Sequence, residues 1–578
     1  MTTLVILRFL GIFAVYTGVT LALPALMFRR ILRGRSLAEQ FLMCYTFGNF
    51  YIINIVFLLQ LLHISNFFTL AGLTAVLSIV IGGRVNRIPL KQQAGNTWHL
   101  FGKLLRGRMK LKSAIFLFLG KCAEGIKRLV KFFYRHIVKN PIQSMLLLGI
   151  GVCLCWIYGR QIILVYGYRA SDIPVHMSWI NEMSRGKIFA KGVYPFGFHC
   201  MIYYLHAVFR FDTYVILCQF FFAQVIFMHL VLLAMLKQLC KTKYIPYIGT
   251  FVFLLGNFWS GQTYSRFYAT LPQEFGMIFV IPSIYFLIRF FQIPKQKLAD
   301  KETRLTLQCF AMAFSLTLAI HFYGTMIAGL CCIGIACGFC FRFLRKEYFC
   351  RIMFTGICSV FLAVLPMGIA FATGTPLQGS LGWGLSVING GKSSSSTEAE
   401  AETDEAETLE VSTGDDKNTV RVVKPDGTVM EIDVSDLPSA QENESGGQMQ
   451  TETTAPAVPK VSFGEKIRKI PGKAKNALSE MSSRILEFII KLDVKNIGYM
   501  ILASFALLLL LGFIFCVFRQ TEYGAMLMSM GFCMWIVTIL LCAGVFGLPP
   551  LMDGARCSIY YVYLLSAALT ALADGLLY

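Results

Sequence analysis

The stretch LVILRFLGIFAVYTGVTLALPALM, residues 4–27, decides the class of fold. A helix of about 20 apolar residues crosses the ~30 Å hydrocarbon core of a membrane, and a helix also satisfies its own backbone hydrogen bonds there. The stretch is too long for the core of a signal peptide. No basic segment precedes it and no small-residue cleavage site follows it, so we expect an uncleaved span.

Similar runs recur along the whole chain. The chain has 578 residues, of which 56% are hydrophobic, and a soluble protein could not bury that much apolar surface. We therefore predict an all-α membrane protein, a polytopic bundle of about thirteen transmembrane helices. The predicted spans are 4–28, 38–62, 66–83, 142–165, 212–236, 243–259, 275–292, 305–321, 322–341, 352–373, 496–518, 524–546 and 557–577.

The charge distribution predicts the topology. The net charge is +21, but residues 391–460 hold 16 of the 32 acidic residues and only five basic ones. Loop 84–141 carries 14 Lys or Arg and one acidic residue, Glu124, which is typical of a cytoplasmic loop. Counting through the spans places 166–211, 260–274, 374–495 and 547–556 outside, and we expect a multi-pass protein of the cell membrane. Within 84–141 we expect either a helix lying on the inner leaflet or a solvated basic linker.

The same patterns divide the chain into segments. The low-complexity stretch 393–410 is predicted to be disordered, whereas 419–434 alternates around Pro425-Asp426-Gly427, which indicates a hairpin. The predicted segments are a three-span unit at 1–83, the basic loop 84–141, a core with the first outer loop at 142–375, an acidic insertion with the hairpin at 376–460, an amphipathic interfacial helix at 461–495 and the last spans at 496–578.

Several functional classes lack their motifs. The 18 cysteines form no paired CxxC pattern, so neither a zinc site nor a disulfide framework is expected. No phosphate-binding P-loop is present, and no stacking module accompanies the basic charge, so we expect neither an ATP-driven pump nor nucleic-acid binding. No cofactor is predicted, because Asp172 and His176 alone are weak support for a divalent metal.

The first outer loop carries the main candidates for chemistry. Asp172 and His176 are four residues apart, so they share one face if the segment is helical. A carboxylate at the outer face can act as a general base on a hydroxyl. His176 could change the basicity of this carboxylate or bind substrate. The alternative is that Asp172 caps a helix and His176 is an ordinary surface ring. After them, Tyr194, Gly197 and His199 lie in a turn that starts a short interfacial helix, or in an aromatic belt.

Further candidates lie at other outer loops. Arg266 suits bidentate binding of a lipid phosphate, with Gln273 nearby, although Arg266 and Glu274 could simply form a surface pair. His321 sits at a tight turn between two spans, and Arg556 stands at the start of the last span, where it could also be a snorkelling anchor.

Together these motifs resemble one family. Asp172-x3-His176, then Tyr194-Pro195-x-Gly197-Phe198-His199, is similar to the first outer loop of bacterial GT-C-type integral-membrane glycosyltransferases, and the Arg266 and His321 loops occur at similar places. The resemblance covers roughly 142–375, and the chain adds three N-terminal spans and the acidic insertion. It implies a polyprenyl-phosphate-sugar donor, transfer outside the cytoplasm and Asp172 as the base.

We therefore expect transfer of a sugar to a cell-envelope glycan, with membrane lipid, the polyprenyl-phosphate sugar and the glycan acceptor as partners. In this hypothesis Arg266 and Arg556 hold the leaving phosphate. The alternatives are a non-enzymatic exporter or flippase of lipid-linked glycans, favoured by basic residues along a central cavity, and a structural protein of envelope assembly that uses 391–495.

Overall fold

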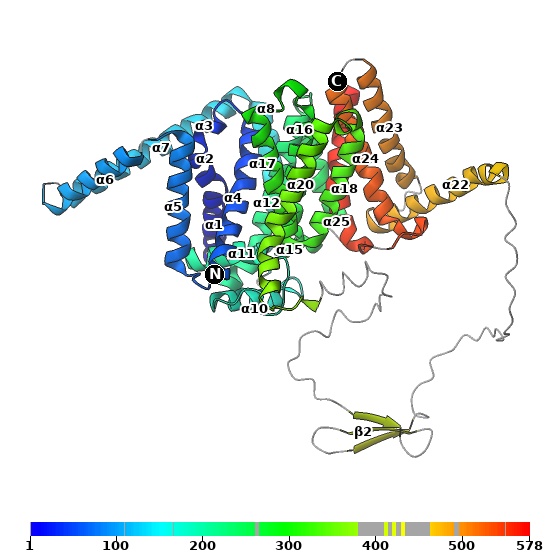
Figure 1. Cartoon of the computed structure of the whole chain (residues 1–578), viewed down its shortest axis with the longest axis horizontal. Helices are drawn as coiled ribbons and strands as arrows, with labels where there is room; N and C mark the ends of the chain where they lie inside the picture. Colours follow the sequence, from blue (N-terminus) through cyan, green and yellow to red (C-terminus); the bar gives the residue numbers. More distant parts are fainter. Residues whose placement is uncertain are drawn as a thin grey trace. The chain divides into compact units, whose positions relative to one another are not determined.

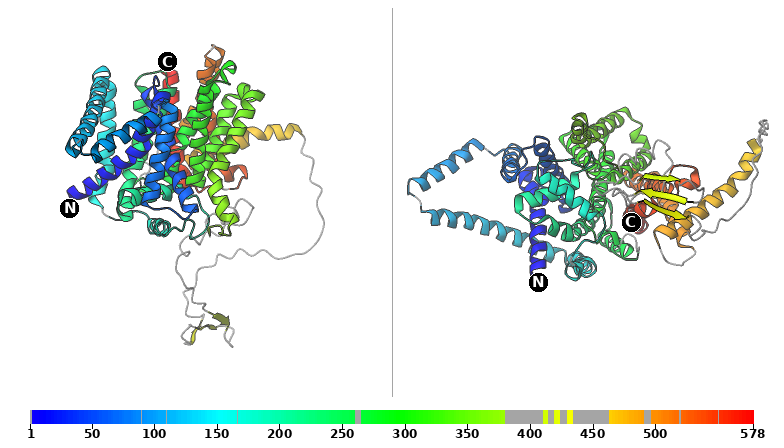
Figure 2. Two further views of the ribbon diagram at one scale, coloured as in Figure 1. Left: turned by 60° about the vertical axis from the view of Figure 1, so that its left-hand side comes forward. Right: turned by 90° about the horizontal axis from the view of Figure 1, so that it is seen from below.

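The computed structural model describes residues 2–88, 90–108, 110–165, 167–259, 265–379, 410–413, 419–423, 429–433, 463–490, 496–518, 520–549 and 551–578. They belong to two compact units, residues 1–388 with 474–578 and residues 389–473. The first unit is a bundle of helices with roughly parallel axes (Figure 1), and Figure 2 shows it turned and end-on. Its helices are α1 (Thr2–Thr17), α2 (Leu23–Met27), α3 (Arg29–Leu32), α4 (Leu37–Leu61), α5 (Phe67–Asn86), α6 (Leu90–Leu105), α7 (Leu111–Lys139), α8 (Pro141–Leu154), α9 (Gln161–Leu164), α10 (Ile173–Ser184), α11 (Gly197–Phe209), α12 (Thr213–Leu239), α13 (Ile245–Trp259), α15 (Pro272–Met277), α16 (Val280–Gln292), α17 (Lys301–Ile320), α18 (Phe322–Gly338), α19 (Cys340–Phe343), α20 (Lys346–Ala372), α23 (Ile497–Val517), α24 (Thr521–Leu541) and α25 (Gly554–Leu577).

The predicted all-α polytopic bundle is confirmed. Among the described residues, 11 helices are long and apolar enough to cross a membrane, so the chain is a multi-pass membrane protein in contact with lipid. Each of the thirteen predicted ranges contains a helix, but Ile245–Gly256 and Phe322–Gly338 are shorter apolar helices of 10–17 residues. These two lie beside long neighbours, and their length alone does not establish that they cross the membrane.

The loops gather at the two ends of the bundle as the topology prediction requires. At one end, the backbone N–H of Val193 donates to the carbonyl of Pro376 over 2.8 Å. At the other end, Arg35 pairs with Glu302 at 2.6 Å. Basic loops thus share one end, and the loops that carry the candidate residues share the opposite end. Which end faces the cytoplasm stays a prediction from the Lys and Arg count.

Small residues bring the last spans against the middle of the chain. A Cβ at Gly334 would lie 2.7 Å from the backbone nitrogen of Cys533, and one at Gly338 would lie 2.2 Å from Oγ of Ser529. Such close approach of α18 and α24 is the usual way for membrane helices to pack. At the same side of the bundle as the basic loops, the carboxylate of Asp574 accepts hydrogen bonds from the backbone of Lys241 and Thr242, each 2.8 Å.

The second unit contains a small antiparallel sheet. β2 (Thr419–Val423) pairs with β3 (Val429–Asp433), with Val420 opposite Ile432, so the predicted hairpin is confirmed. β1 (Glu410–Thr413), which the sequence pattern did not indicate, pairs with β2 and adds a third strand. The predicted disorder of 393–410 falls almost wholly outside the described residues.

The two predicted interfacial segments are helical. α22 (Phe463–Phe488) covers most of the basic amphipathic stretch; its second half belongs to the first unit, where Met481 and Ile485 are buried. α7 is one continuous helix through the basic loop, and large apolar side chains such as Phe116 and Tyr134 are exposed on it. Exposed apolar side chains beside lysines and arginines favour the leaflet-bound helix over a solvated linker.

Candidate functional site

Five segments meet at the end of the bundle opposite the basic loops. They are α10, α11, the loop 265–271 with the start of α15 (Pro272–Met277), the junction of α17 and α18, and the start of α25. Figure 1 shows α10 and α11 lying across this end of the upright helices. The candidate residues predicted from separate loops are therefore brought into one neighbourhood.

Asp172 occupies the N-cap position of α10, but its side chain makes no capping hydrogen bond. Its backbone is itself helical, with φ −76° and ψ −14°, which turns the carboxylate away from the first-turn N–H groups. The side chain is exposed and accepts one hydrogen bond, from Oγ of Ser171 at 3.3 Å. The alternative interpretation of Asp172 as a side-chain cap is therefore wrong, and the carboxylate faces the outside of the cluster.

His176 and His199 form a buried pair behind Asp172. Nε2 of His199 lies 3.1 Å from Nδ1 of His176, and both rings are buried, so His176 is not a surface residue. Burial lowers the pKa of His176 to about 4, against the opposing charge of Asp172. Burial and the neighbouring His176 also lower the pKa of His199. Both rings are thus neutral at neutral pH.

The hydrogen-bond geometry selects a tautomer for this pair. Nδ1 of His199 is buried without a partner. A buried N–H without an acceptor is rarer than a buried acceptor without a donor, so we assign the proton of His199 to Nε2, which donates to Nδ1 of His176. His176 then carries its own proton on Nε2. One hydrogen bond thus joins the two neutral rings, and His176 follows Asp172 by one helical turn.

Aromatic rings enclose the histidines. Trp179, which follows His176 by three residues on α10, stacks on Phe196 and lies 5.5 Å from the ring of Tyr194. Burial raises the pKa of Tyr194 to about 12, with Arg556, Tyr323 and Asp172 also acting on it. His199 is therefore buried and Tyr194 half-buried among these rings, and the predicted aromatic turn is a packed element.

Gly197 has a structural role that its place in the motif did not reveal. A Cβ at this position would lie 2.8 Å from the carbonyl oxygen of Ala319. The glycine lets α11 touch the end of α17 immediately before His321. Gly197 is buried, and it sets how closely α11 packs against α17 beside the site.

Arg266 and Glu274 form an ion pair of 2.5 Å, and the side chain of Glu274 is only 2% exposed. The expected pair of Arg266 and Glu274 therefore forms, but it is not a surface pair, because Glu274 is buried and Arg266 is half-buried. Burial opposes the charge of Arg266, but the charge of Glu274 outweighs it, and the pKa of Arg266 is raised. Nη2 of Arg266 also donates to Oε1 of Gln273 at 3.2 Å, and Nε2 of Gln273 donates to the carbonyl of Arg556 at 3.4 Å. Gln273 thus links the loop to α25.

His321 and Arg556 complete the cluster. Nδ1 of His321 accepts from the backbone N–H of Tyr323 at 3.2 Å and caps α18. Burial lowers the pKa of His321 to about 3, and the charges of Arg556, Arg266 and His176 act in the same direction. The guanidinium of Arg556 lies 5.7 Å from the ring centroid of Tyr323, a cation–π distance. Arg556 therefore faces this cluster and is not a snorkelling anchor alone.

Sequence reasoning missed three contributors. Trp179 sits one turn after His176 on the same face, a spacing that could have indicated it. Tyr323 was visible only as part of the His321 turn. Glu274 was noticed as a partner of Arg266, but its burial and its unpartnered Oε2 were not foreseen.

The described residues contain no group of three His, Cys, Asp or Glu side chains that could hold a metal ion. No protein-family model matches the sequence, and no curated protein or solved structure is detectably similar to the chain. The functional interpretation therefore depends on the chemistry of the cluster itself.

Proposed function

We propose that the protein is an integral membrane glycosyltransferase with a GT-C-like core, which transfers a sugar from a polyprenyl-phosphate donor to a cell-envelope glycan on the extracytoplasmic side of the cell membrane. One observation carries the proposal: the exposed carboxylate of Asp172 stands at the edge of a cluster that also holds the cations Arg266 and Arg556. A base beside two cations is the arrangement that transfer from a sugar phosphate requires.

The proposed reaction assigns the base and the two cations of the cluster separate roles. The carboxylate of Asp172 accepts the proton of an acceptor hydroxyl while that oxygen bonds to the anomeric carbon. The bond from that carbon to the phosphate oxygen breaks, and its electron pair leaves with the polyprenyl phosphate. The charge that grows on the phosphate is stabilised by Arg556 and Arg266.

The buried groups have positioning roles in this mechanism. Glu274 and Gln273 fix the plane of the Arg266 guanidinium through bonds of 2.5 and 3.2 Å. Because His176 and His199 are neutral, they add no cation that would weaken Asp172 as a base.

Substitution of Asp172 tests the proposal. Asp172→Asn keeps the shape but removes the proton acceptor, so transfer should fall by about 10²–10⁴-fold. Asp212→Asn is the matched control: Asp212 is a true N-cap, accepting from the N–H of Val215 at 3.2 Å, and Asn caps almost as well. The assay is incorporation of label from a panel of radiolabelled polyprenyl-phosphate sugars in membranes.

Two results would contradict the proposal. One is full activity of Asp172→Asn, which would remove the base from the mechanism. The other is no incorporation from any donor in the panel by the folded wild-type protein.

The exporter alternative gains no comparable support. The groove of about 910 Å³ formed by α16, α17, α18, α19 and α20 opens on the side of the bundle and is lined by apolar residues, so it is not the basic central passage that an exporter of charged glycans would use.

A further inference from the structure

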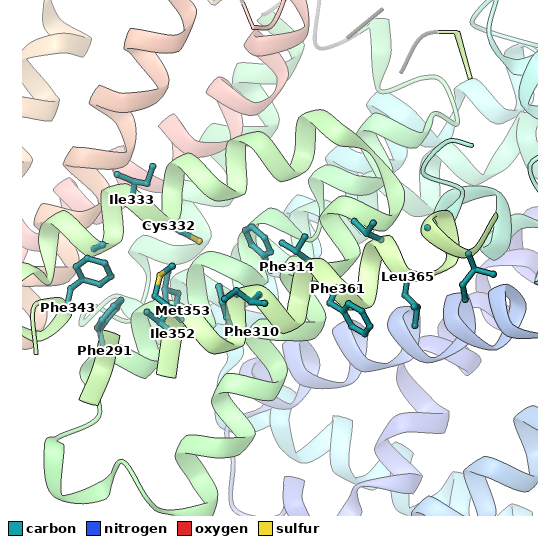
Figure 3. A pocket seen from close by; sticks show the side chains of 18 of the residues that line it. Phe291, Phe310, Phe314, Cys332, Ile333, Phe343, Ile352, Met353, Phe361 and Leu365 are labelled. Atoms are coloured by element: carbon teal, nitrogen blue, oxygen red, sulfur yellow. The ribbon is translucent and has the colours of Figure 1, made fainter. Parts of the chain in front are cut away.

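A long apolar groove opens on the side of the bundle, and its lining differs from the polar and charged residues of the candidate site. It is formed by α16, α17, α18, α19 and α20, has a volume of about 910 Å³ and is lined by 19 residues, all of them apolar (Figure 3). Phe310, Phe314, Phe361 and Leu365 line its middle part. A groove of this size is at the upper end of ligand pockets, which hold about 300–1,000 Å³.

The groove runs along one face of α20. Its lining on this helix extends from Ile352 to Ala372, which at ~1.5 Å per residue covers ~30 Å. That length equals the hydrocarbon thickness of a membrane. The half that starts at Ile352 therefore lies in the leaflet next to the basic loops.

The apolar face of α20 continues into cations at that end. Phe349 precedes Ile352 and Met353 by three and four residues and follows Lys346 by three, so these four residues lie on one stripe of the helix. Arg345 stands at the N-cap position immediately before this stripe. Arg345 and Lys346 are exposed, and their side chains make no hydrogen bond or ion pair with any other described residue. The neighbouring acid, Glu347, pairs with Lys295 at 2.5 Å, and the charge of Arg345 also acts on it.

We propose that this end of the groove is a binding site for an anionic phospholipid of the leaflet on the basic side of the bundle. The acyl chains lie in the groove against Ile352 and Gly356, and the phosphate and headgroup are held by Arg345 and Lys346. Exposed cations beside an apolar groove complement a lipid that carries a negative headgroup on apolar chains. The site is independent of the proposed glycosyl transfer and lies at the other end of the bundle.

Two glycines allow a matched test of the groove. Gly356 and Gly368 both line it on α20, and at both positions an added Cβ meets nothing within 4 Å. Gly356→Phe fills the half beside the cations, whereas Gly368→Phe fills the opposite half by the same chemical change. Arg351→Gln is the matched control for the cations, because Arg351 is close in sequence but off the stripe.

The experiment is native mass spectrometry of the full-length protein equilibrated in detergent with equimolar phosphatidylglycerol and phosphatidylcholine. We expect a preference for phosphatidylglycerol that falls about 5-fold for each of Arg345→Gln and Lys346→Gln, the usual weight of a basic residue at an anionic surface. Gly356→Phe should lower retention of phosphatidylglycerol, while Gly368→Phe and Arg351→Gln should leave it unchanged. Melting in the same detergent checks that each variant is folded.

Three outcomes would overturn the proposal. The wild type could show no headgroup preference, which would make the groove a site for ordinary boundary lipid. Arg351→Gln could lower the preference as much as Arg345→Gln, which would indicate diffuse attraction. Polyprenyl phosphate, added as a competitor at equal concentration, could displace the phospholipid completely and be blocked equally by both phenylalanine variants, which would assign the whole groove to the long-chain carrier.

Discussion

The substitution Glu274→Gln should destabilise the protein by about 2–3 kcal/mol. The amide oxygen of the new side chain can still accept from Nε of Arg266, but a charge-assisted hydrogen bond of about 1.5–3 kcal/mol becomes a neutral one of about 0.5–1.5. Oε2 of Glu274 is buried without a partner, so the amide nitrogen that replaces it adds a buried donor without an acceptor, at about 1–3 kcal/mol. The side chain of Arg266 remains 29% exposed, and its access to water lowers the total.

The free energy of unfolding is measured by SDS titration in mixed micelles, with Glu347→Gln as the control. Glu347 pairs with Lys295 at the same 2.5 Å, but the two side chains are 45% and 54% exposed, so this substitution should have little effect. The double variant Arg266→Gln with Glu274→Gln should be less destabilised than the sum of the single variants, because neither charge is then left alone. Equal effects of Glu274→Gln and Glu347→Gln would refute the reasoning, since burial would then make no difference to the pair.

The remaining predictions concern pH, packing and topology. Because the pKa of His176 is lowered from 6.5 to about 4 in the folded protein, the unfolded chain binds the proton more tightly. The stabilisation is therefore fully present above pH 6.5, and the free energy of unfolding should fall by up to ~3 kcal/mol as the pH drops toward 4. Unfolding titrations at several pH values measure this fall, which should be smaller in His176→Gln. Gly338→Val should destabilise the protein by about 1–3 kcal/mol through overpacking against α24. Gly329→Val on the same helix meets open space and should change the stability little. Equal melting temperatures of the two variants would contradict the close contact. In intact cells without native reactive cysteines, a cysteine introduced in 84–141 should be protected from a membrane-impermeant reagent and one in 391–460 labelled; the reverse pattern would overturn the topology.

The spans were predictable because their signal is local. A run such as 213–239 is apolar at nearly every position, and the length of the run alone indicates a helix across the membrane. The hairpin at 419–434 was also visible, because the alternation and the Pro-Asp-Gly turn are contained within a few residues. β1 was missed because four residues in a polar segment carry no pattern of their own.

The site was only partly predictable, because its contacts join distant segments. The spacing of Asp172 and His176 indicated one helical face, but the contact of His176 with His199 depends on how α10 packs against α11. The burial of Glu274 depends in the same way on the start of α25, where the backbone carbonyl of Arg556 accepts a hydrogen bond from Gln273. A sequence motif indicates which residues can react, whereas the packing of separate helices determines which of these residues are exposed and which are charged.

The contacts of α18 with α24 and of Asp574 with the α12–α13 loop have a further consequence. They join residues on both sides of the insertion into one unit, since 1–388 and 474–578 are held together by packing and hydrogen bonds and not only by the connecting chain. The peptide connection through 389–473 is therefore not what holds the two parts of the membrane bundle together. We therefore expect that two polypeptides made by splitting the chain inside that stretch would reassemble in the bilayer, so that each part could be labelled separately.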